Sequence, residues 1–210
     1  MKIHHLGHGQ SERILWLCEE LELPYELVKY TRDPVTRLAP PELLALHPMG
    51  AAPVLETEGM LLAESPAIVD FLLARHGAGR LRPAPAHPDF AAYLYWFHFA
   101  NGNLQPLFLR AMALGRALPE DHPVRRATLE RQARTLAHVE ARLANTDYLA
   151  GDFGAADIMT VFSLTTMRLF YPVDLGPYPA IRAYLQRVGA RPAYRRAMAK
   201  GDPDLVPLLA

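Results

Sequence analysis

The hydroxyl groups of two serines are each predicted to lie at the start of a helix. Ser65 comes directly before Pro66, and this order is typical of a helix start, because a serine hydroxyl accepts an unpaired backbone N–H and proline fits the first helical position. Ser11 opens another helix-forming stretch and carries the only hydroxyl between Leu6 and Arg13. A helix start also offers free N–H groups and a partial positive charge. The sequence therefore predicts two helix N-termini that are able to hold an anionic group.

A short hairpin is expected to lead the chain to Ser65. Pro53 fits the first residue of a strand, since proline cannot donate to a sheet ladder. Gly59 lies in a polar break between two apolar runs, which predicts a tight turn that pairs Val54–Leu55 with Met60–Leu62. The helix that follows has an apolar face made by Ile68, Val69, Leu72 and Leu73.

The first part of the chain alternates strand and helix signals. The expected elements are, in order, a strand at 2–6, a helix from 11 to 23, a strand at 25–30, a short helix at 42–46, the hairpin and a helix from 65 to 77. The order β-α-β-α-β-β-α begins with a parallel crossover and ends antiparallel. This order predicts a thioredoxin-like domain.

The second part of the chain is expected to be all-helical. Residues 78–88 have the glycine and proline content of a linker between domains, and strand signals nearly vanish after them. Helices are predicted at 89–114 with a bend at Pro106, at 124–143 and at 155–170, with shorter ones from 178 and from 192. The predicted fold is therefore α/β plus all-α, with domains at 1–77 and 89–210.

The composition narrows the possible classes of function. Lys plus Arg number 22 and Asp plus Glu number 22, so no net charge draws the chain to nucleic acid or anionic lipid. The uncharged stretch 90–109 has the length of a membrane span, but its polar residues and proline favour a buried helix. Cys18 is the only cysteine, and residues 1–5 lack the apolar core of a signal peptide. We therefore expect a cytoplasmic protein with no nucleic-acid and no membrane partner.

The whole arrangement resembles the glutathione transferase (GST) family. The match lies in Pro53-Val54-Leu55, in the hairpin and in Glu64-Ser65-Pro66-Ala67-Ile68, and the linker and helical part agree with it. Residues 151–158 look like the family's capping segment before its central helix, in which Asp157 is expected to bond back to the Gly154 amide. Residues 28–50 look most like a bacterial and fungal subgroup with a serine-type active site.

The resemblance implies that glutathione is the co-substrate. The residues expected to bind it are His47, Ala52, Pro53, Glu64 and Ser65. In the family the proline is cis, and the residue before it, here Ala52, offers its backbone to the cysteinyl part. Ser65 would hold the γ-glutamyl carboxylate, Glu64 its ammonium group and His47 the glycyl carboxylate. Ala51 stands where the family often has a basic residue, so weaker glutathione binding is expected.

The family's reaction is attack by the glutathione thiolate on an electrophile. The site must therefore lower the pKa of the thiol, and each pKa unit corresponds to about 1.36 kcal/mol. Relatives in the subgroup tend to carry a serine at position 9, where this chain has Gly9. Ser11 and His8 are the candidate catalytic residues, and the backbone N–H groups of Gly9 and Gln10 are the alternative. Ser11 could instead serve only as the N-cap of its helix.

Aromatic residues concentrate after the linker and suggest where an apolar electrophile binds. The expected pocket residues are Tyr95, Phe99 and Phe108, although aromatics at helical spacing more often form a core. The resemblance also implies a homodimer and a role in detoxification. The preferred reading is therefore a glutathione transferase that conjugates glutathione to small hydrophobic electrophiles.

Two other functions remain open at this point. The same site could serve a glutathione-dependent peroxidase or disulfide reductase. A non-catalytic ligand-binding or interaction protein is the other alternative, and Gly9 and Ala51 favour it. A metal site built from His4, His5 and His8 has no acidic or cysteine partner nearby in the sequence, so no metal is expected.

Overall fold

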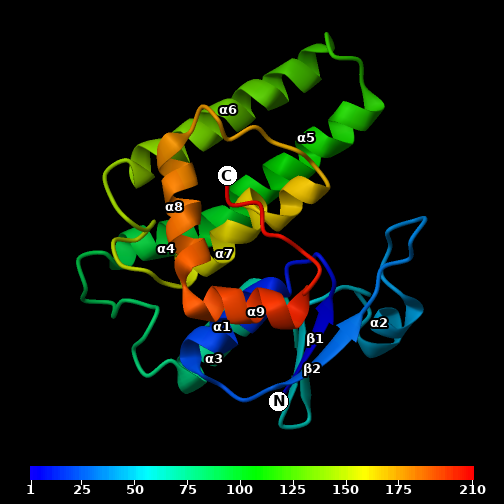
Figure 1. The fold of residues 1–210 in the computed structure, drawn as a ribbon, viewed down its shortest axis with the longest axis vertical. Helices are drawn as coiled ribbons and strands as arrows, with labels where there is room; N and C mark the ends of the chain where they lie inside the picture. Colours follow the sequence, from blue (N-terminus) through cyan, green and yellow to red (C-terminus); the bar gives the residue numbers. More distant parts are fainter. The chain divides into compact units, whose positions relative to one another are not determined.

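The structure, a computed structural model, describes all 210 residues and divides into two compact units. The first unit comprises residues 1–82 and 189–207, and the second comprises 83–188 and 208–210. The grouping differs from the predicted division at 77 and 89 because α9 (Pro192–Gly201) packs along α1 (Glu12–Leu21). Figure 1 shows these two helices side by side. The division of the chain into domains at 1–77 and 89–210 stays a prediction.

A four-stranded sheet in the order β2-β1-β3-β4 forms the centre of the first unit. Its strands are β1 (Lys2–Leu6), β2 (Glu26–Tyr30), β3 (Val54–Thr57) and β4 (Met60–Ala63). β1 and β2 are parallel, whereas β3 is antiparallel to both β1 and β4. With α1, α2 (Pro41–Leu46) and α3 (Ser65–His76), the predicted order β-α-β-α-β-β-α is confirmed.

The hairpin between β3 and β4 has the predicted two-residue turn. Thr57 pairs with Met60, and the two residues between them, Glu58 and Gly59, have φ values of 51° and 75°. Positive φ at both central residues is the conformation of a type I′ turn, which matches the twist of the flanking strands. The turn thereby fixes the register that sets Ala63 opposite Val54.

The core of the first unit lies between the sheet and helices α1 and α3. Ile3 and Leu55 from the strands and Ile14 and Ile68 from the helices are fully buried. Cys18 of α1 is also fully buried. The apolar faces read from the sequence are therefore the ones that pack.

The second unit is all-helical, as predicted. Its elements are α4 (Phe90–Phe99), a π-helical turn (Ala100–Leu104), α5 (Gln105–Ala117), α6 (Pro123–Leu143), α7 (Ala155–Leu164), a 3₁₀ turn (Thr166–Leu169) and α8 (Pro179–Ala190), whose last residues belong to the first unit. The π-helical turn, which ends two residues before Pro106, interrupts the helix near the predicted bend, and the bend itself stays a prediction. α7 ends earlier than the predicted 170. None of the helices has both the length and the apolarity needed to cross a bilayer.

Asp157 organises the start of α7, the buried central helix of this unit. Its carboxylate accepts the Gly154 N–H at 2.9 Å, the predicted bond, and also accepts the Leu149 N–H and the Tyr184 hydroxyl, both at 3.0 Å. Burial raises the pKa of Asp157 to about 6, although these donors oppose the shift. The capping segment is therefore a structural feature, as expected.

Candidate functional site

Three loops of the first unit meet at one edge of the sheet. His4 of β1 lies opposite Val54 of β3, and Val54 lies opposite Ala63 of β4. Because these strands are antiparallel neighbours, the residues after β1, before β3 and after β4 lie at the same edge. The register therefore brings together residues 7–11, 52–53 and 64–65, which contain most of the predicted site residues.

The segment from Gly7 to Ser11, here called the β1–α1 turn, ends at the start of α1. The first two amides of α1 donate to the carbonyls of Gly9 and Gln10, at 3.1 Å each. The amides of Gly9, Gln10 and Ser11 donate to no acceptor in the protein, but Ser11 is fully buried, so a ligand can meet only the amides of Gly9 and Gln10. They stand at the positive end of the helix dipole. The turn can therefore stabilise an anion without a side chain.

Ser11 is fully buried, and its hydroxyl is engaged within the protein. The Ser11 Oγ lies 2.8 Å from His5 Nδ1 and accepts the Leu6 N–H at 3.2 Å. Ser11 occupies the N-cap position, but its hydroxyl accepts no amide of α1, so the side-chain cap interaction predicted as its alternative role is wrong. The reason is that His5, from the neighbouring strand, takes the hydroxyl. A covered hydroxyl touches no ligand, so this geometry does not support the predicted catalytic contact of Ser11.

His8 and Gly9 give the turn an unusual backbone. His8 has a φ of 55°, and its N–H donates to Asp202 Oδ1 at 3.0 Å. A Cβ on Gly9 would lie only 2.7 Å from the Leu6 carbonyl oxygen. The path of the backbone at position 9 therefore leaves too little room for a serine side chain. His8 is half-exposed and lines the pocket that opens on the β2 side of the turn.

Ala52 and Pro53 form the second part of the site. The peptide bond between them is cis, as the resemblance implied. Ala52 is half-buried, and its N–H and C=O bond to no protein group, because the sheet ladder begins only at Val54. One donor and one acceptor are therefore available for another peptide.

Ser65 and Glu64 form the third part of the site at the start of α3. Ser65 is the first helical residue, and Glu64, with a φ of 70°, takes the cap position. The predicted cap bond of Ser65 is therefore wrong, and its Oγ instead accepts Arg13 Nη1 at 3.0 Å. The Ser65 hydroxyl proton and backbone N–H remain available for a ligand carboxylate. Glu64 is exposed, and its carboxylate forms no hydrogen bond or ion pair within the protein.

Arg13 is a site residue that sequence reasoning missed. It is fully buried, and one guanidinium nitrogen donates to both Ser65 Oγ, at 3.0 Å, and Gln10 Oε1, at 2.9 Å. Burial lowers the pKa of Arg13 to about 9. The only signal in the sequence was an arginine at the start of an apolar helix. Arg13 links the β1–α1 turn to the start of α3.

His47 lies in the loop before Ala52, where the resemblance placed it. Its Nδ1 accepts the Met49 N–H at 3.3 Å, so the ring helps to shape this loop. The ring is half-exposed. Its predicted contact with the glycyl carboxylate stays a prediction.

The predicted electrophile residues lie in the second unit and are mostly core. Phe99 and Phe108 are buried, and Phe108 packs against Tyr171. Tyr95 is half-exposed; its ring stacks on Phe99, and its hydroxyl lies 2.9 Å from His138 Nε2. Tyr95 is therefore the only one of the three that offers its ring to a ligand.

The three histidines considered for a metal site point to different partners. His4 Nδ1 lies 2.9 Å from the Tyr30 hydroxyl, and His4 Nε2 lies 3.4 Å from a Glu56 oxygen. His5 faces Ser11 on one side and Asp202 on the other. No group of three or more His, Cys, Asp or Glu side chains is placed to hold a metal ion.

A pocket of about 290 Å³ opens on the β2 side of the turn. Its lining includes Gly7 and His8 of the turn, Arg32 after β2 and Asp202 after α9. It shares only His8 with the predicted site residues. Asp202, like Arg13, was not expected from the sequence, because it lies 194 residues from the His8 amide that it binds.

Family models match both parts of the chain. The N-terminal domain of glutathione S-transferase matches residues 10–75, and the C-terminal domain of glutathione S-transferase matches residues 102–192.

Individual proteins match almost the whole chain. Glutathione S-transferase 3 of Schizosaccharomyces pombe is 28% identical over 99% of this chain and 90% of its own length. The disulfide-bond oxidoreductase YfcG of Escherichia coli is 28% identical over 91% of each chain. A crystal structure of a glutathione S-transferase from Actinobacillus pleuropneumoniae is 32% identical, covers 96% of this chain and 92% of its own, and superposes with a TM-score of 0.88.

Proposed function

Because this chain belongs to the glutathione S-transferase family, we propose that it is a glutathione transferase that conjugates the glutathione thiolate to small hydrophobic electrophiles. The observation that carries the proposal is the set of unpaired backbone groups at one edge of the sheet. These groups belong to the β1–α1 turn, to Ala52 and to Ser65. They match the thiol, the peptide group and the γ-glutamyl carboxylate of one glutathione molecule.

The start of α3 binds the γ-glutamyl end in this proposal. The Ser65 hydroxyl and N–H donate to the carboxylate, and the helix dipole adds a favourable field. The exposed carboxylate of Glu64 pairs with the ammonium group. Arg13 fixes the direction of the Ser65 hydroxyl through its bond to Oγ. The peptide group of the cysteinyl residue pairs with the N–H and C=O of Ala52.

The amides of the β1–α1 turn activate the thiol in this proposal. Hydrogen bonds to a charged sulfur and the positive end of α1 together supply about 1–3 kcal/mol, enough to lower a thiol pKa by about one to two units. We assign this role to the backbone because the Ser11 hydroxyl is covered and position 9 is glycine. His8 is placed to add a donor from its ring.

The chemical step then needs little further help from the protein. The thiol proton leaves to solvent when the thiolate forms. The sulfur attacks the electrophilic carbon, a C–S bond forms, and the leaving group departs with its electron pair. The homodimer and the detoxification role are further parts of the proposal that the resemblance alone supports.

Glutathione-dependent disulfide reduction is the second candidate function. The similarity to the oxidoreductase from Escherichia coli favours it. The chain's own thiol is unsuited to such chemistry, because burial and the nearby Glu19 raise the pKa of Cys18 to about 12. Any disulfide reduction therefore runs through thiolates of bound glutathione, and rates with a chloronitrobenzene and with a small organic disulfide distinguish the two functions.

Calorimetric titration of Ser65→Ala with glutathione tests the site. We expect binding to weaken about tenfold or more, because a hydrogen bond to a charged carboxylate is lost. Ser163→Ala is the matched control, since Ser163 is also a buried serine and its hydroxyl has no partner. The control is expected to bind glutathione like the wild type. An unchanged affinity in Ser65→Ala would contradict the glutathione assignment.

A further inference from the structure

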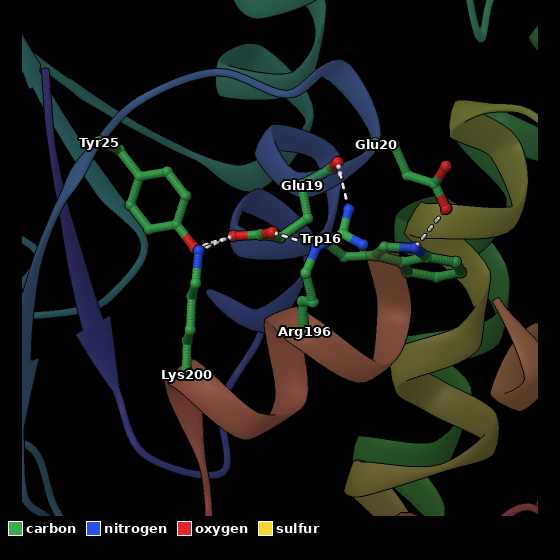
Figure 2. Close-up of polar contacts among 6 residues, drawn as sticks. All are labelled: Trp16, Glu19, Glu20, Tyr25, Arg196 and Lys200. Atoms are coloured by element: carbon green, nitrogen blue, oxygen red, sulfur yellow. Dashed lines mark hydrogen bonds and ion pairs between the residues drawn. The ribbon is translucent and has the colours of Figure 1, made fainter. Parts of the chain in front are cut away.

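The last helix of the first unit, α9, is held on α1 by a buried carboxylate. Glu19 of α1 accepts a hydrogen bond from Arg196 Nε at 2.9 Å, and it also accepts bonds from Lys200 and from the Tyr25 hydroxyl. Figure 2 shows the carboxylate reached from both sides by these groups. Three donors on one buried carboxylate fix the position of α9 along α1.

A second set of contacts fixes the other end of α9. Glu20 pairs with Arg191 at 2.7 Å. It also accepts a hydrogen bond from Trp16 Nε1 at 2.9 Å (Figure 2). The Trp16 ring meets the Tyr194 ring edge to face, with centroids 4.9 Å apart. With both ends held, the C-terminal end of α9 has little freedom to move away from α1.

The end of α9 therefore lies against the start of α1 and the end of β1. A Cβ on Gly201 would come 2.8 Å from a methyl group of Leu15 and 3.4 Å from the His5 ring, so any side chain here would displace the Leu15 methyl group. The next residue, Asp202, has a side chain that is only 6% exposed. Its carboxylate is thereby placed beneath the β1–α1 turn.

Asp202 contacts the turn in two ways. Its Oδ1 accepts the His8 N–H at 3.0 Å, and its Oδ2 lies 3.3 Å from His5 Nε2. These two atoms, Oδ2 and Nε2, are buried and have no other partner. The other His5 nitrogen, Nδ1, lies 2.8 Å from Ser11 Oγ, which accepts the Leu6 N–H. A continuous chain of contacts thus joins α9 to both ends of the turn.

The backbone of the turn needs such support. His8 is in the left-handed region, with a φ of 55°, which is unfavourable for a residue with a side chain. The bond from its N–H to Asp202 holds it there. The next residue is Gly9, whose close approach to Leu6 depends on the same conformation.

We propose that Asp202 and His5 are positioning residues that hold the β1–α1 turn so that its free amides converge on the glutathione sulfur. This inference rests on the proposed function, because it assumes that the sulfur lies at the turn. In this role Asp202 and His5 act through the backbone of the turn and need no contact with glutathione. The buried Ser11 holds the end of the turn through its contact with His5, and the carboxylate of Asp202 holds the backbone at His8.

Amide hydrogen exchange of the protein without glutathione is the first test. In Asp202→Ala the His8 amide loses its acceptor, and we expect the amide of His8 to exchange about tenfold or more faster than in the wild type. Asp204→Asn is the matched control: it removes a charge two residues away, and its exposed carboxylate bonds nothing in the turn. The control is expected to leave exchange in the turn unchanged. Unchanged exchange in Asp202→Ala would overturn the proposal.

The pH midpoint of thiolate formation on bound glutathione is the second test. We expect Asp202→Ala to raise this midpoint by about one pH unit, a tenfold fall in the ionisation constant of the thiol. Removing a negative charge would by itself lower the midpoint, so the direction separates positioning from simple electrostatics. Asp202→Asn keeps an acceptor for the His8 N–H and is expected to fall between the two proteins. It also replaces the alanine variant if that variant does not fold.

The two tests separate the failure of this inference from the failure of the proposed function. If exchange in the turn rises but the wild type itself does not depress the thiol midpoint, the turn is positioned as inferred and the proposed function is wrong. If the wild type depresses the midpoint and Asp202→Ala does so equally, the positioning role is wrong and the proposed function stands.

Discussion

Restoring a serine at position 9, where relatives of the subgroup carry one, is expected to damage this protein. A Cβ on Gly9 would lie 2.7 Å from the Leu6 carbonyl oxygen and 3.4 Å from an Arg32 nitrogen. The Leu6 oxygen belongs to the backbone at the end of β1, so the β1–α1 turn has to shift. Overpacking of this kind costs about 1–3 kcal/mol. We therefore expect Gly9→Ser to lower the free energy of unfolding by about this amount.

The same shift is expected to weaken thiol activation. A cost of 1 kcal/mol corresponds to about 2–4 °C in the unfolding midpoint of a chain of this length, so thermal unfolding by circular dichroism resolves it. Thiolate absorbance against pH on the same sample is expected to show a raised midpoint. Gly9→Ala is the control that adds the Cβ without the hydroxyl, and it should behave like Gly9→Ser. Wild-type stability together with a lower thiol midpoint in Gly9→Ser would refute the reasoning.

Two further predictions concern buried carboxylates. Burial acts to raise the pKa of Glu19, but hydrogen bonds from Lys200, Arg196 and Tyr25 outweigh it and lower the pKa. Its stabilisation is therefore present above the usual glutamate pKa and is lost as the pH falls through the lower, folded-state value. Glu19→Gln should lower the free energy of unfolding by about 1–3 kcal/mol at pH 7, and the difference between the two proteins in urea unfolding should shrink as the pH falls below the usual glutamate pKa. A constant difference down to pH 3 would contradict this. For Asp157 the pH dependence has the opposite sign, because burial raises the pKa of this carboxyl to about 6. Protonation of Asp157 favours the folded state, and this stabilisation is lost as the pH rises through about 6. The free energy of unfolding of Asp157→Asn should be about 1–3 kcal/mol lower than that of the wild type at pH 4, and this difference should be smaller at pH 7. A difference that grows with pH would show that the folded state favours the charged carboxylate.

Local patterns predicted most of the fold because they depend on neighbouring residues. The turn at Gly59 follows from the backbone preferences of single residues, and the element order follows from apolar periodicity. The strand predicted to start at Pro53 begins one residue later, at Val54. The bond from the Gly154 amide to Asp157 also spans only three residues. These features needed no knowledge of tertiary contacts.

Tertiary contacts account for what the sequence did not predict. Ser11 and Ser65 were expected to cap their helices, but His5 and Arg13 from other elements take their hydroxyl groups. Asp202 reaches the site across 194 residues, a separation at which no periodic signal exists.

Burial likewise overrode part of the pocket prediction. Phe108 was expected to line a substrate pocket, yet aromatic residues on a helix fill whichever space their face meets, and here that space is the core of the second unit.

The thiolate absorbance of glutathione bound to the wild-type protein, measured against pH, tests the central claim most directly. The claim is that the free amides of the β1–α1 turn replace a catalytic hydroxyl. It predicts saturable binding and a thiol midpoint about one to two units below that of free glutathione. Binding with the midpoint of the free thiol would contradict the claim and favour a non-catalytic glutathione-binding protein.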